Sequence, residues 1–314
     1  MLNSLLSPNT QWVLLSTLIL GMAAGMIGCL AYWKRQSLMS DALSHAALPG
    51  VVVAFALTGS KNLLVMILGA AVSALIGAWM IQWIRSTSRI KEDTAMGMIL
   101  SVFFGLGIML LTIVNRTAGG NQSGLDNFIF GQAASMVRKD VVTMLILAVL
   151  VMLVVFIGFK EWKLFLFDPD FAKGLGLNSR LMNSLYMGVL VLVIVIGIQA
   201  VGVILMAAML IIPAVSARYW TQSFRMMVIL SAIFGGGSGF VGTLVSTMGK
   251  GWPTGPFIVV ASSVLFTISL VFGVEKGLLT QAMLLRSQKK EHLEAANPNP
   301  SVLSPRLPGR GSNQ

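Results

Sequence analysis

Long apolar runs separated by short polar segments dominate the chain. Nine runs are close to the roughly 20 residues that a helix needs to cross a bilayer. They cover residues 12–32, 38–57, 63–84, 95–114, 141–159, 183–199, 200–217, 226–245 and 256–274. The stretch 189–215 is almost continuously apolar, so one long helix plus a re-entrant piece is the alternative there. The pattern predicts an all-α polytopic membrane protein with about nine transmembrane helices, or eight on the alternative.

Composition and charge support this class. Hydrophobic residues make up 56% of the 314 residues and charged residues only 11%, against about 25% charged in soluble domains. A net charge of +11 would suggest nucleic acid in a soluble protein, but here the basic residues flank apolar runs. With the N-terminus outside, 17 Lys and Arg residues fall on the inner side and 5 on the outer side. Cytoplasmic positive bias therefore predicts an outside N-terminus, a cytoplasmic C-terminus and no nucleic-acid partner.

The same pattern divides the chain into an extracellular N-terminus (1–11), a transmembrane domain (12–285) and a polar tail (286–314) that we expect to be disordered. Residues 125–136 are too short and polar to span, and are interpreted as an interfacial or re-entrant helix on the outer face. Glycines at 21, 25 and 28, within 235–239 and at 242 predict close helix packing. No GxxxxGK[ST] motif occurs, so nucleotide binding by this chain itself is not expected.

Candidate chemistry concentrates in residues 40–50, SDALSHAALPG. Asp41 is the only acid near a membrane-embedded run and His45 is the only embedded histidine. Four residues apart on a helix, their side chains lie on one face, one turn apart. Ionisable residues inside a membrane are costly and usually mark a pathway or a site. Carboxylate and imidazole are also ligands that divalent cations such as Mn²⁺ or Zn²⁺ accept.

The start of this stretch also has a simpler interpretation. Ser40 or Asp41 could instead cap the start of the second span, although a cap does not require His45 one turn further in. Pro49 and Gly50 are expected to break or kink the helix, which would leave non-helical backbone lining a cavity.

Two ligands are too few to hold a divalent ion, so we hypothesise that two subunits paired about a two-fold axis contribute two Asp and two His. Such a site should bind weakly, because tight binding would trap the ion.

A second constellation lies in the inner loop at 160–180. Asp168 as N-cap, Pro169 at the first helical position and Gly174 or Gly176 at the C-cap predict a short helix. It would present Phe171 and Leu175 on one face, with charges around them. An exposed apolar face on the cytoplasmic side is a candidate docking surface for a partner, and a linker helix lying along the membrane interface is the alternative.

These residues carry a family resemblance. SDALSHAALPG at 40–50, DPDFAKGLGL at 168–177 and VGVILMAAMLIIPAVSAR at 201–218 together resemble the permease subunits of manganese, zinc and iron ABC importers. The resemblance covers about residues 10–285, and LDNFIFGQAA at 125–134 looks most like the manganese-type branch.

The resemblance implies a half-transporter in the bacterial plasma membrane. Two permeases, identical or related, would pair around a central path, two cytoplasmic ATPases would dock and hydrolyse ATP, and an extracellular protein would deliver the metal. No permanent cofactor and no catalytic residue are implied. Asp41 and His45 would line the metal path. The cytoplasmic coupling segment would comprise Asp168, Pro169, Asp170, Phe171, Ala172, Lys173, Gly174, Leu175, Gly176 and Leu177.

Two alternatives are weighed against this reading. A permease for a metal chelate, such as a siderophore or corrinoid, would use a wide path that has no need of an Asp–His pair. A secondary transporter or channel would need further embedded charges for ion coupling, and the sequence offers none beyond the pair. Carboxylate and imidazole suit Mn²⁺, Fe²⁺ and Zn²⁺ alike, so the metal itself is not determined.

Overall fold

Helices account for all the regular structure in the described part of the chain. The computed structural model describes residues 8–59, 63–117, 131, 136, 138–249, 252–283, 285, 286 and 288. Eight helices in this part are long and apolar enough to cross a membrane. They are α2 (Pro8–Trp33), α3 (Ser37–Thr58), α4 (Leu63–Thr87), α5 (Glu92–Thr117), α7 (Arg138–Ile157), α10 (Ser179–Val201), α12 (Phe224–Met248) and α13 (Thr254–Phe272).

Three shorter helices lie between the long ones: α8 (Phe159–Phe167), α9 (Pro169–Gly174) and α11 (Val203–Arg218). Residues 278–283, after α13, are also helical. The multi-pass all-α class is thus confirmed, with eight long helices rather than nine. The proposed interfacial helix at 125–136 and the tail beyond 288 lie outside the described residues, except for Gly131 and Met136.

The division predicted near Gln199 occurs three residues later, at Gly202. This residue ends α10 and starts α11 with a φ of 94°, a backbone conformation that favours glycine. Helix α11 has 16 residues, which is short for a span. The near-continuous apolar run therefore forms one spanning helix followed by a short helix, close to the eight-span alternative.

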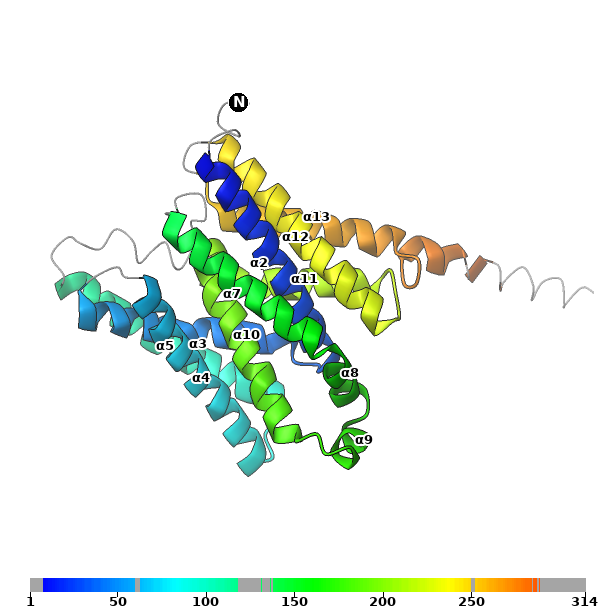
Figure 1. Cartoon of the computed structure of the whole chain (residues 1–314), viewed down its shortest axis with the longest axis horizontal. Helices are drawn as coiled ribbons and strands as arrows, with labels where there is room; N and C mark the ends of the chain where they lie inside the picture. The colour runs from blue at the N-terminus through cyan, green and yellow to red at the C-terminus, as the bar shows by residue number, and fades with distance from the viewer. Residues whose placement is uncertain are drawn as a thin grey trace, which may run out of the picture.

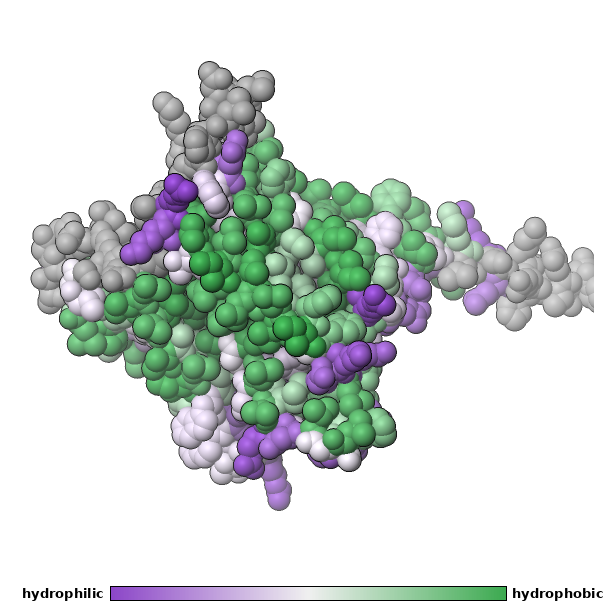
Figure 2. All heavy atoms as spheres, in the orientation of Figure 1, coloured by the Kyte–Doolittle hydropathy of each residue, from purple (hydrophilic) through white to green (hydrophobic). Residues whose placement is uncertain are grey.

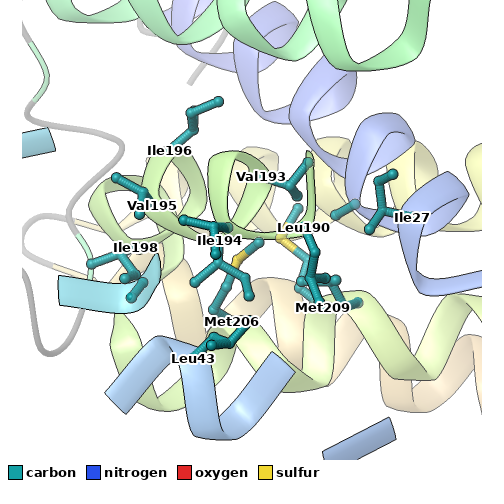
Figure 3. Packing of buried hydrophobic residues seen from close by; sticks show 14 of the residues in the cluster. Ile27, Leu43, Leu190, Val193, Ile194, Val195, Ile196, Ile198, Met206 and Met209 are labelled. Carbon is teal, nitrogen blue, oxygen red and sulfur yellow. The ribbon is translucent and has the colours of Figure 1, made fainter. Parts of the chain in front are cut away.

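Helix α10 runs through the middle of the bundle. Its residues Leu190, Val193 and Ile194 are buried, and Figure 3 shows them packed between Ile27 of α2 and Met206 of α11. Helices α2 and α3 are also largely buried, whereas only a third or less of the spanning stretches of α4, α5, α7 and α13 is buried. In a bilayer the exposed apolar side chains of these helices can face lipid. Figure 2 shows this apolar surface on one face, with hydrophilic residues gathered towards the ends of the helices.

Close packing of α2 against α12 confirms the glycine interpretation. A Cβ added at Gly21 would lie 2.2 Å from the carbonyl oxygen of Gly235, and one at Gly25 would lie 2.1 Å from that of Ser231. Ser231 in turn donates a hydrogen bond to the carbonyl of Gly25 across the interface. The two helices lie side by side along much of their length (Figure 1).

One end of the bundle carries the segment between α7 and α10. Helices α8 and α9 project beyond the lower ends of α2 and α7 in Figure 1. The turn between α2 and α3 lies at the same end, because Trp33 at the end of α2 packs on Phe167 at the end of α8 with ring centroids 4.7 Å apart. The beginning of α3, and with it the candidate metal-path residues, is therefore near the candidate coupling segment.

Candidate metal-path site and coupling segment

Asp41 and His45 lie well inside helix α3. The helix starts at Ser37 and its N-cap is Gln36, which makes no side-chain capping bond. Ser40 donates its hydroxyl hydrogen to the carbonyl of Ser37, 3.1 Å away, and caps nothing. The capping alternative is therefore wrong, because the helix begins four residues before Asp41.

The two side chains face each other as the spacing predicted. His45 Nε2 lies 3.5 Å from Asp41 Oδ1, and the exposed fractions of the side chains are 13% and 34%. The imidazole packs edge-on against Phe104 of α5, with ring centroids 4.8 Å apart. His45 Nδ1 is buried without a hydrogen-bond partner. The arrangement leaves an accessible carboxylate beside an imidazole that a neighbouring aromatic ring holds in place.

The ligand set within one chain is small. Among the described residues no group of three or more His, Cys, Asp and Glu side chains lies close enough to hold a metal ion. Structural metal sites usually have four ligands. A carboxylate and an imidazole alone suit a site that an ion passes, and not one that retains it.

Pro49 does not break the helix, contrary to expectation. Helix α3 continues through it to Thr58. Nearby, Ser73 of α4 donates a hydrogen bond of 2.6 Å to the carbonyl of Ala46. A side chain from another helix therefore supplies a hydrogen-bond donor to the backbone near the proline. Gly50 allows α4 to come this close, since a Cβ there would lie 2.0 Å from the carbonyl oxygen of Gly69.

An apolar groove of about 480 Å³ begins at this proline and runs between α3, α4 and α5. Its walls include Val53, Leu57, Leu68 and Leu106. Neither Asp41 nor His45 lines it, and its surface offers a cation almost no polar ligand. The groove therefore does not extend the metal-path site.

The short helix predicted in the inner loop is present. Asp168 is the N-cap of α9 and accepts a hydrogen bond from the backbone N–H of Phe171 at 3.0 Å, with Pro169 at the first position. Leu175 is the C-cap, and Gly176 follows with a φ of 84°. Of the two glycines considered, Gly176 thus takes the left-handed position that ends the helix.

The exposed face of α9 also matches the sequence pattern. Phe171 and Leu175 are 57% and 62% exposed, whereas Ala172 between them is buried. Lys173 and Asp170 form an exposed ion pair of 2.9 Å beside them. Two large apolar side chains therefore point away from the bundle at the end that carries the inner loop.

An aromatic cluster fixes the helix that precedes α9. Phe167 of α8 packs on Trp33 of α2 and on Phe224 of α12, and Phe159 stacks on Phe224 at 5.3 Å. Trp33 also donates its indole N–H to the sulfur of Met227, 3.1 Å away. Helix α8 is thereby packed against two spanning helices.

Two residues at these sites carried no signal in the sequence. Phe104 lies in an ordinary apolar run, and only the packing of α5 on α3 places it against His45. Lys34 resembles any basic residue at the end of a span, yet its ammonium group contacts Asn183, which is 149 positions away in the chain.

Comparison with known proteins places these features in a family. The model of the ABC 3 transport family matches residues 7–273, which includes both the Asp–His pair and the inner loop. The chain belongs to the ABC 3 transport family. Its relatives include transport-system membrane proteins from two bacteria.

The manganese transport system membrane protein MntC of Bacillus subtilis is 48% identical over 288 residues, which cover 91% of this chain and 66% of that protein. The chain therefore spans slightly less than two thirds of that relative's length. The zinc transport system membrane protein TroC of Treponema pallidum is 43% identical over 271 residues, 86% of this chain and 91% of that protein.

A solved structure gives the same fold. PsaBC from Streptococcus pneumoniae, in complex with an antibody fragment, contains a chain that superposes with a TM-score of 0.78 at 31% identity, covering 91% of this chain and 98% of that one. The arrangement of helices described above is thus shared with that chain.

Proposed function

We propose that this chain is the membrane-spanning permease subunit of an ABC importer that takes up divalent transition-metal ions. The observation that carries the proposal is the Asp41–His45 pair, 3.5 Å apart and embedded in helix α3 of an ABC 3 family member. The pair supplies two ligands that Mn²⁺, Fe²⁺ and Zn²⁺ accept. The relatives named above are manganese and zinc transport proteins, and manganese is the first candidate.

The assembly follows from what one chain lacks. Two ligands per chain are too few for an ion, so a second permease subunit, identical or related, would complete the site with its own carboxylate and imidazole. The chain has no P-loop motif, so separate cytoplasmic ATPase subunits would supply ATP hydrolysis. The exposed Phe171 and Leu175 of α9 would suit a hydrophobic pocket on such a subunit. An extracellular binding protein would deliver the metal on the opposite side.

In transport, the pair would bind the ion transiently. Asp41 supplies charge and an oxygen ligand, and its 34% exposure leaves it open to an arriving ion. His45 supplies a nitrogen ligand whose ring is held by Phe104. Binding here must be weak enough for release when the path opens to the cytoplasm. Alternation between the two openings would be driven by ATP binding and hydrolysis on the partner subunits.

The experiment is ATP-driven uptake of radioactive Mn²⁺ by the complete importer reconstituted in liposomes with its ATPases and binding protein. We expect Asp41→Ala and His45→Ala each to lower uptake at least about tenfold, a loss of ~1.4 kcal/mol or more in ion stabilisation. Asp93→Ala, which removes an exposed acid at the start of α5, is the matched control and should transport normally.

Unchanged uptake in both variants would overturn the proposed role of the pair. The same liposomes separate the alternatives. Transport by this chain alone, driven by an ion gradient without ATPase subunits, would indicate a secondary transporter. Uptake of a metal chelate with no uptake of free Mn²⁺ would indicate a chelate permease.

A further inference from the structure

Side chains in the short turn between α2 and α3 contact several other helices. Lys34, Arg35 and Gln36 form it, with Arg35 in the left-handed conformation at a φ of 58°. Backbone bonds of 3.0 Å from the N–H groups of these three residues to carbonyls in the last turn of α2 close the turn tightly. Helix α3 starts at the next residue and reaches Asp41 four positions later. Any displacement of this turn therefore displaces the metal-path helix.

Lys34 joins the turn to α10 and α8. Its ammonium group donates a 2.6 Å hydrogen bond to Oδ1 of Asn183 in α10. The same group lies 4.2 Å from the ring centroid of Tyr186 in α10 and 5.3 Å from that of Phe165 in α8. These are cation–π distances. One partly buried charge thus contacts two helices that flank the coupling segment on either side.

Gln36 joins the same turn to α5 and α4. It is 2% exposed and donates its side-chain N–H to Glu92, the first residue of α5. Glu92 also pairs with Arg85 near the end of α4 at 3.2 Å. The two helices that pack beside the metal-path helix are therefore linked to the turn that starts it.

Helix α8 contacts two consecutive residues at this turn. Phe167, which directly precedes the N-cap Asp168 of α9, packs on Trp33. Phe165, two residues earlier, faces the ammonium group of Lys34. A force applied to α9 would reach the start of α3 through these side chains, without passing through the membrane core.

The charge of Lys34 is costly where it sits. The pKa of Lys34 is lowered from 10.5 to about 8, mainly by burial, with Glu92 raising it and Arg85 lowering it by smaller amounts. An apolar side chain of similar length would fill the same space without this desolvation. The hydrogen bond to Asn183 and the rings of Tyr186 and Phe165 offset part of this cost and hold the ammonium group at the junction.

We infer that Lys34 is a positioning residue that ties α8 and α10 to the start of α3, so that movement of the coupling segment is transmitted to Asp41 and His45. The inference rests on the proposed function, since it needs ATPase subunits acting on α9. On this inference Lys34 transmits movement driven by ATP hydrolysis to the start of α3. It does not contact the metal.

The test is Lys34→Met in the complete reconstituted importer, with Mn²⁺ uptake and ATP hydrolysis measured in the same liposomes. Methionine keeps an unbranched side chain and removes the charge. We expect uptake to fall about tenfold or more. Basal ATP hydrolysis should stay within about twofold of the wild type, but the metal-loaded binding protein should no longer stimulate it. Lys91→Met removes an exposed lysine beside Glu92 and should leave uptake and its coupling to ATP unchanged.

A pH profile separates positioning from simple packing. Charged Lys34 predominates below about pH 8, so metal taken up per ATP hydrolysed should decline as the pH on the α9 side rises through 8. The charged and titratable groups that face Lys34 are Glu92, Arg85 and Tyr186. Asn183→Asp keeps the acceptor and adds a negative charge, which should maintain uptake and move the decline to higher pH. Lys34→Met should give a low and flat ratio.

Three results would overturn the inference. They are normal coupling in Lys34→Met, a complex that loses assembly and ATP hydrolysis together, and a pH profile that Asn183→Asp leaves in place. In each case the wild type and Asp41→Ala still report on the proposed function. If the wild-type complex itself shows no ATP-driven metal uptake, the proposed function fails and the inference fails with it.

Discussion

At the scale of single residues, Asp168 shows how one carboxylate can serve a helix or a partner. Its Oδ1 accepts the backbone N–H of Phe171 at 3.0 Å, which satisfies a donor that the first turn of α9 leaves free. Pro169 at the next position has no N–H to satisfy. Since α9 has only six residues, its conformation depends heavily on this cap, and the orientation of Phe171 and Leu175 depends on α9.

The cap role leads to a prediction with two substitutions. Asp168→Ala removes the acceptor and should destabilise α9 by about 1 kcal/mol, so the permease should bind its ATPase subunits about fivefold more weakly. Asp168→Asn retains an oxygen acceptor and should bind almost normally. The measurement is the affinity of purified ATPase subunits for the permease in nanodiscs. Equal weakening by Asn and Ala would mean that the negative charge itself contacts the ATPase.

At the scale of helices, local sequence patterns predicted where helices end better than they predicted which helices contact each other. The cap, proline and glycine around α9 predicted a helix that is present, because helix ends are determined by neighbouring residues. Gly202 ends α10 through its own backbone conformation, but the apolar run around it hid that position. Pro49 and Gly50 were expected to break or kink α3, yet the helix continues to Thr58. The hydrogen bond from Ser73 to the neighbouring backbone comes from another helix, and no local pattern reveals it.

Glycine positions on α12 give a prediction about packing. Gly235→Ala would place a Cβ 2.2 Å from the Gly21 carbonyl, so α2 and α12 would have to separate. We expect a loss of about 1–3 kcal/mol, typical of overpacking. Gly237→Ala, two residues along the same helix, meets nothing within 4 Å and should leave stability unchanged. Thermal unfolding in detergent compares the two, and equal melting temperatures would contradict the packing argument.

At the scale of the whole molecule, sequence reasoning identified the pieces and structure supplied their connections. The Asp41–His45 pair and the short helix α9 are contained within single stretches, so their spacing predicted them. The hydrogen bond between Lys34 and Asn183, by contrast, joins residues 149 positions apart and depends on how α2, α8 and α10 pack. Charge at a helix end gives no sign of whether it will be solvated or enclosed by other helices.

Orientation in the membrane remains a prediction from charge, and the structure makes it testable at two positions. Phe224, at the start of α12, packs on Phe167 of α8. Trp252 follows the other end of α12, a helix of 25 residues, which is about 37 Å long. Lys160 on α8 and Trp252 are therefore at opposite ends of the bundle. The excess of basic residues at the α8 end predicts that this end is cytoplasmic.

Cysteine labelling of intact cells tests this orientation. The single native cysteine, Cys29, is buried in α2, so a membrane-impermeant maleimide should not label the wild type. We expect Trp252→Cys to be labelled in intact cells and Lys160→Cys only after permeabilisation, since both side chains are exposed and only one faces outward. The reverse pattern would place α9 outside the cell, where no ATPase could reach it, and would refute both the orientation and the coupling role of that segment.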